Sequence, residues 1–72
     1  MPRTLTEEQS VKLAKLLIMM NIPKEDRLEI ITAIETPVEM RLFLDKLSVK
    51  NFKMSPEEVS QALFETIEET QA

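Results

Sequence analysis

Apolar and charged positions recur along this chain at the spacing of α-helices. Apolar residues recur at intervals of three and four rather than two, and the chain contains no glycine. Strands and tight hairpins therefore have little support. The pattern predicts helices over 7–20, 23–34, 37–48 and 56–69. We expect an all-α fold in which residues 1–72 form one compact bundle of four short helices.

Three of the predicted helices begin with a recognisable start signal. A threonine or serine stands before each one, and a glutamine or glutamate follows three residues later, in the pairs Thr6 and Gln9, Thr36 and Glu39, and Ser55 and Glu58. Proline occupies the first position of three predicted helices, at Pro23, Pro37 and Pro56, where its missing amide hydrogen costs nothing. These spacings predict side-chain caps on the free backbone amides.

The helix ends are marked by asparagine and proline. Asn21 is suited to a left-handed residue just after the first helix, with Ile22 folding back on Leu17 and Pro23 preventing continuation. The segment 48–53 breaks the helical period and is predicted to be a loop. It is also the connection that could act as a hinge if the fourth helix were exchanged between two chains.

The first predicted helix has an unusually wide apolar arc. The five consecutive apolar residues from Leu16 to Met20 point in every direction, at about 100° per residue. We therefore expect this helix to be central and surrounded by the others. Met19 lies within the charged stripe of Glu8, Lys12 and Lys15, which makes it a candidate for an interface.

The third predicted helix is apolar on two sides. Its main stripe contains Met40, Phe43, Leu44 and Leu47, and the opposite side carries Val38, Leu42 and Val49. Such a helix is either sandwiched between layers or contributes to an interface. In the fourth helix the buried stripe is predicted to be Val59, Ala62, Leu63 and Ile67, with Phe64 at its margin.

The small size of the chain favours association with another chain. At 72 residues it is near the lower limit for folding alone, and without cysteine or histidine it has no disulfide or imidazole zinc site to support it. We expect a homodimer or a complex with another protein. The predicted partner interface consists of Met19, Val38, Leu42 and Phe64. No apolar run approaches the roughly 18 residues of a membrane span, so we expect a soluble, cytoplasmic protein without membrane attachment.

Composition argues against catalysis. No histidine or cysteine is present to act as a base or nucleophile, and the serines and threonines stand chiefly at predicted caps. The absence of glycine excludes Gly-rich phosphate loops. The glutamates of the last predicted helix are better explained as a solvated face than as a metal site. We expect no enzyme activity, cofactor, metal or small-molecule substrate.

Charge is distributed unevenly along the chain. The net charge is −4, and every lysine and arginine lies at or before Lys53, which leaves the last predicted helix purely acidic. A local basic patch is formed by Arg41, Lys46, Lys50, Phe52 and Lys53. These cations could contact nucleic acid, or they could stabilise the end of the third helix and pair with the acidic fourth.

These patterns lead to one functional expectation and one alternative. We expect a small, self-associating protein-interaction or regulatory module, in which exposed apolar side chains anchor a partner and the acidic helix favours a basic one. The alternative is a small nucleic-acid-associated regulator that uses the basic patch.

Overall fold

The computed structural model describes residues 5–71, which form four helices and no strand. These are α1 (Glu7–Met19), α2 (Lys24–Ala33), α3 (Pro37–Val49) and α4 (Pro56–Gln71). The predicted all-α bundle is confirmed, and each predicted helix end lies within two residues of the observed one. Residues 1–4 and 72 of the predicted domain lie outside the described residues. None of the four helices is long and apolar enough to cross a membrane.

Reciprocal side-chain caps begin three of the helices, as predicted. They are formed by Thr6 with Gln9, Thr36 with Glu39, and Ser55 with Glu58. In the first of them, the Gln9 amide donates to Thr6 Oγ1 at 3.1 Å and the Thr6 amide donates to Gln9 Oε1 at 3.0 Å. Each cap satisfies amides that the helix itself leaves without a partner.

Helix α1 ends in a Schellman motif. The Ile22 amide donates to the Leu17 carbonyl and the Asn21 amide donates to the Ile18 carbonyl, both at 3.0 Å. Asn21 has a left-handed φ of 61°, a conformation that asparagine tolerates better than most residues. The predicted end of the first helix is therefore confirmed. The Arg27 guanidinium strengthens this turn by donating to the Ile22 carbonyl at 2.9 Å.

Helix α3 ends in the same way, but at a greater conformational cost. The amides of Asn51 and Phe52 donate to the carbonyls of Ser48 and Leu47, both at 2.9 Å. Asn51 and Phe52 have φ values of 53° and 61°, and a left-handed aromatic residue is uncommon. Because α3 continues to Val49, the predicted loop 48–53 shortens to a hydrogen-bonded turn. It leads to an α4 that packs within its own chain.

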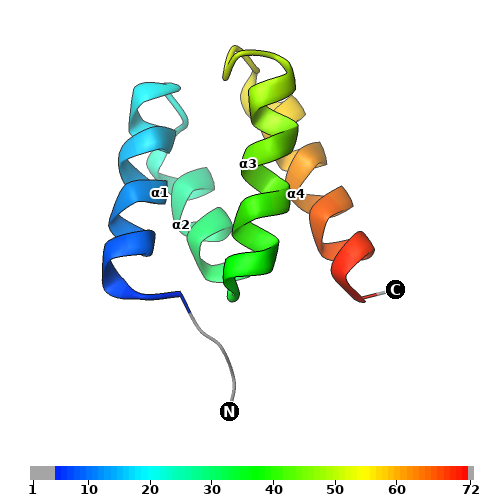
Figure 1. Ribbon diagram of the computed structural model, residues 1–72. Coiled ribbons are helices and arrows are strands. Elements are labelled where there is room, and N and C mark those ends of the chain that lie inside the picture. Colours follow the sequence, from blue (N-terminus) through cyan, green and yellow to red (C-terminus); the bar gives the residue numbers. More distant parts are fainter. Residues whose placement is uncertain (1–4, 72) are drawn as a thin grey trace.

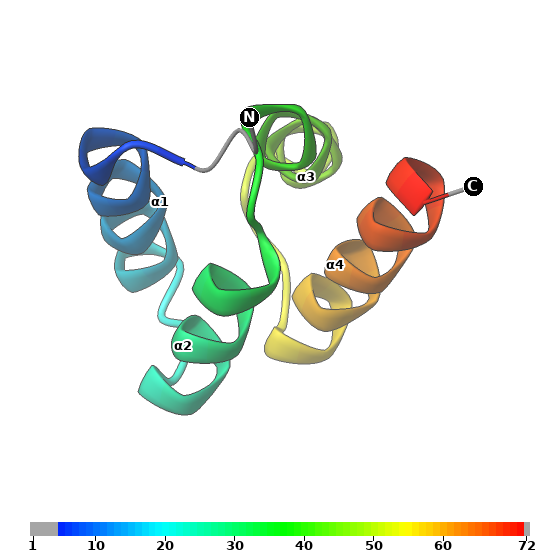
Figure 2. The same ribbon diagram turned by 90° about the horizontal axis from the view of Figure 1, so that it is seen from below.

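The helices are arranged so that α2 lies between α1 and α4, and α3 packs against α4 (Figures 1 and 2). The expectation that the first helix is central is wrong. Of the other three helices, α2 alone comes close to the backbone of α1. Leu17 is buried in the core, whereas Ile18 and Met19 remain exposed. A wide apolar arc does not guarantee a neighbouring helix on every side. Here the short turn between α1 and α2 places a single helix, α2, beside α1.

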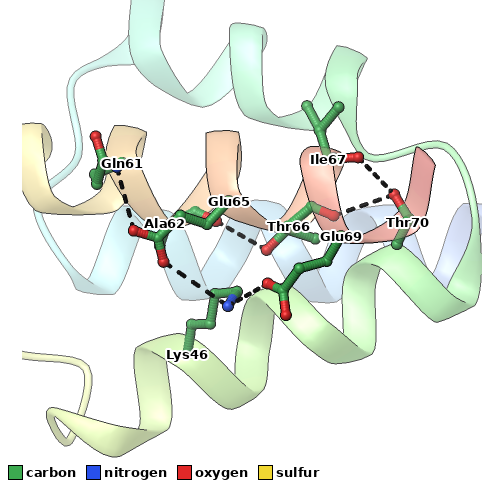
Figure 3. A network of polar contacts seen from close by, with 8 residues as sticks. All are labelled: Lys46, Gln61, Ala62, Glu65, Thr66, Ile67, Glu69 and Thr70. Carbon is green, nitrogen blue, oxygen red and sulfur yellow. Dashed lines mark hydrogen bonds and ion pairs between the residues drawn. The ribbon is translucent and has the colours of Figure 1, made fainter. Parts of the chain in front are cut away.

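The core is formed by one connected cluster of side chains from all four helices. Its buried members are Leu13, Leu17, Ile22, Ile30, Ile34, Met40, Phe43, Leu47, Val59, Ala62 and Leu63. Ile67 is only partly buried. Thr66 joins the core although the sequence pattern did not predict it, and its hydroxyl donates to the Ala62 carbonyl at 2.8 Å (Figure 3). This bond removes the cost of burying the hydroxyl group.

Candidate interaction surface

The second apolar side of α3 lies on the surface of the protein. Val38 is 61% exposed, Val49 is 81% exposed, and Leu42 is half-buried. Their spacings of four and seven residues place them on one side of the helix, and we call this set the α3 stripe. The sandwiched arrangement considered for this helix is therefore wrong. An exposed row of apolar side chains is what an interface requires.

The α3 stripe adjoins a groove between α3 and α4. Val49 belongs to both, and together with Met54 and Ala62 it provides the apolar lining of this groove, which has a volume of about 330 Å³. Polar side chains complete the lining. They are Lys46 of α3, Lys50 directly after α3, and Glu58, Gln61 and Glu65 of α4. We call this feature the α3–α4 groove. The stripe and the groove meet at Val49, and charged side chains border both.

Ion pairs across the groove connect the two helices. Lys50 Nζ lies 2.7 Å from Glu58 Oε2, and Lys46 pairs with Glu69 and, at 3.9 Å, with Glu65 (Figure 3). The hydrogen bond from Lys50 lowers the pKa of Glu58 to about 2, with help from the Ser55 amide. The hydrogen bond to Glu69 raises the pKa of Lys46 above its usual value. Both shifts favour the charged forms and so keep the pairs ionised at neutral pH.

The predicted basic patch does not gather on one face. Lys46 and Lys50 pair with glutamates of α4, which is the structural role that the sequence left open for them. Arg41 lies about 140° around α3 from Lys46, at about 100° per residue. Phe52 and Lys53 lie in the turn after α3. The pairing leaves no concentrated positive surface at these five residues, so this geometry does not favour contact with phosphates.

The four residues of the predicted partner interface fall into separate places. Val38 and Leu42 lie together on α3. Met19, which is 78% exposed, is at the end of α1 that points away from the start of α3 (Figure 1). Phe64 is 58% exposed on the outer side of α4, with Glu57 and Glu68 at helical spacing around it. One partner helix contacting α3 would therefore touch Val38 and Leu42 first.

Several surface apolar residues were not identified as exposed from the sequence. Ile18 belongs to the arc of the first helix that was expected to be surrounded, yet it is about half exposed, as are Val11 of α1 and Leu28 of α2. No signal in the sequence distinguishes them from their buried neighbours, because periodicity gives an angular position and not the neighbour that occupies it.

The five glutamates of α4 lie on two sides of the helix, with Glu65 and Glu69 on the side that faces α3. Within residues 5–71, no three acidic side chains are arranged to hold a cation. Lys46 instead lies among Glu65 and Glu69 and balances part of their charge (Figure 3).

Comparison with known proteins gives no relative from which a function could be transferred: no family model, curated protein or solved structure matches this chain.

Proposed function

We propose that this chain is a protein-interaction module that binds its partner through the α3 stripe and the adjoining α3–α4 groove. The observation that carries the proposal is the row of Val38, Leu42 and Val49 on one side of α3, in which both valines are exposed and Leu42 is half-buried. Apolar side chains gathered on one side of a helix raise the free energy of the exposed surface in water. They therefore favour association with another surface.

The α3 stripe is better suited to binding than the other exposed apolar residues. Val11, Ile18 and Leu28 do not line the α3–α4 groove, and exposed apolar residues without such a groove are common on ordinary surfaces. Leu42 is half-buried against its own chain and is therefore held in place before a partner arrives. Ion pairs of Lys46 and Lys50 also fix α3 against α4, so binding sacrifices little conformational freedom.

Charge supports a preference among partners. Helix α4 carries five glutamates and no basic residue, and the two lysines that pair with it leave the surrounding surface acidic. Such a surface repels acidic proteins and speeds encounter with basic ones. The apolar row provides the anchor, and the acidic border provides the selectivity.

Site-specific photo-crosslinking tests this proposal. A benzophenone amino acid is placed at Val49, and the matched control carries it at Ser60, which is exposed on α4 outside the groove lining. Both variants are irradiated in an extract of native cells and, separately, as concentrated pure protein. We expect protein adducts from position 49, whether with another protein or with a second copy, and far fewer from position 60.

The addition of Leu42→Asp to the position-49 variant provides the specificity control. The charged side chain should abolish the adducts while leaving the circular dichroism spectrum helical, because residue 42 lies at the surface of α3. Equal yields from positions 49 and 60, or no adducts from either, would show that α3 is not an interaction surface.

A further inference from the structure

Both ends of the α3 stripe are valine, so a two-fold axis can pair one end of the stripe with the other. Val38 and Val49 lie at equal distances from a point between Phe43 and Leu44, and Leu42 lies close to that point. Charges of opposite sign, on Arg41 and Asp45, stand on either side of the same point. A two-fold axis beside the helix and level with this point would place an identical helix antiparallel to the first, with each surface opposed to itself.

From this pattern we propose that the partner seated on the α3 stripe is a second copy of this chain, with the two α3 helices antiparallel. Val38 of one copy then lies level with Val49 of the partner subunit, and the two Leu42 side chains meet near the axis. This inference rests on the proposed function and names its partner.

The charges give this register a specific advantage. Arg41 and Asp45 are both exposed, and neither takes part in an ion pair within residues 5–71. Both lie on the border of the stripe that faces away from Lys46 and the groove, at about 100° per residue. A two-fold axis brings the same border of each helix together. Arg41 therefore comes within about one helical step, or roughly 1.5 Å along the axis, of Asp45 of the partner subunit.

The size of the contact determines its strength. Helix α3 contains 13 residues and is therefore about 20 Å long. A single pair of such helices covers less area than the roughly 1,600 Å² of a standard stable interface. We expect a dimer in rapid exchange with the monomer, which dissociates on dilution.

Charge exchange between positions 41 and 45 tests the register. Arg41→Asp and Asp45→Arg each place like charges opposite one another, and each should weaken dimerisation about tenfold. The double variant, with both substitutions, restores opposite charges and should recover most of the affinity. The measurement is the dimer dissociation constant by sedimentation equilibrium. A double variant as weak as the two single variants, or single variants that dimerise normally, would overturn the antiparallel register.

Cysteine crosslinking provides an independent test, because the chain has no cysteine of its own. Val38→Cys and Val49→Cys are oxidised separately and as a mixture, with Met19→Cys as the exposed control. We expect disulfide-linked dimers chiefly in the mixture of the first two variants. Efficient crosslinking of Val49→Cys with itself, or of Met19→Cys, would place the contact elsewhere.

These experiments separate the two proposals. A protein that stays monomeric at high concentration, yet forms adducts with a different protein from position 49, retains the proposed function and overturns the second copy as partner. A monomer without any adducts overturns both.

Discussion

Lys50 and Glu58 connect the end of α3 to the first turn of α4 through a contact of 2.7 Å between Nζ and Oε2. The other oxygen of Glu58 accepts from the Ser55 amide at 3.0 Å, as part of the cap of α4. One carboxylate thus both begins a helix and holds that helix against its neighbour. This double role explains why the pKa of Glu58 is lowered to about 2.

The lowered pKa of Glu58 predicts a specific dependence of stability on pH. The folded state holds this proton more weakly than the unfolded state, whose pKa is near 4.5. The interaction therefore stabilises the fold above about pH 4.5 and is lost as the pH falls from there towards 2. Urea unfolding of the native protein and of Glu58→Gln from pH 7 to pH 2 should give curves that converge at low pH. A constant difference between them would contradict this assignment.

Asn21 should contribute to the stability of the fold because its backbone is left-handed. Replacing it with alanine removes the side chain that tolerates φ near 61°, and we expect a loss of about 1 kcal/mol in the free energy of unfolding. Asn21→Gly should retain or slightly raise stability, because glycine adopts this conformation freely. Urea unfolding compares the three proteins, and equal stability of the alanine and glycine variants would refute the explanation.

Thr66 allows the hydroxyl group and the methyl group to be assessed separately. Thr66→Val removes a buried hydroxyl whose acceptor, the Ala62 carbonyl, is on the same helix, so stability should change by less than about 0.5 kcal/mol. Thr66→Ser keeps the hydroxyl and leaves a small cavity, at a cost of about 1 kcal/mol. Thermal unfolding measures both variants. A larger loss for valine than for serine would mean that the hydrogen bond holds the site together.

Two adjacent residues of α1 test the position of this helix at the edge of the fold. Ile18 is exposed and Leu17 is buried, although the sequence pattern places both in one apolar arc. Ile18→Lys should change the free energy of unfolding by less than about 0.5 kcal/mol, whereas Leu17→Ala should lower it by about 2 to 5 kcal/mol. If Ile18→Lys were as damaging as Leu17→Ala, α1 would be covered on a second side.

The features that could be predicted from the sequence are those that depend on a few neighbouring residues. The Thr36 and Glu39 cap and the left-handed Asn21 are determined by local hydrogen bonds, and both were identified correctly. Burial in a wide arc depends on which helix packs on which, and this information is distributed over the whole chain. For that reason Ile18 and the position of α1 could not be predicted.

In the candidate site, too, some features depend on neighbouring residues and others on how the helices pack. Helical spacing alone places Val38, Leu42 and Val49 on one side of α3, and the structure shows that side at the surface. The separation of Met19 from this stripe arises from the packing of α1 on α2, and the groove beside Val49 arises from the packing of α3 on α4. These features could not be derived from the spacing of residues in any single helix.

The edge position of α1 also determines which helix of the folded protein opens most readily. Helix α1 has only α2 as a close neighbour among the described helices, whereas α4 is held by both α2 and α3. Sub-global opening should therefore begin with α1, and native-state hydrogen exchange should report a lower opening free energy for its amides than for those of α4. A partner bound on α3 would slow exchange in α3 and α4 and leave α1 free to open. The protein then consists of a labile helix at one edge and a steadier pair, α3 and α4, that carries the proposed binding surface.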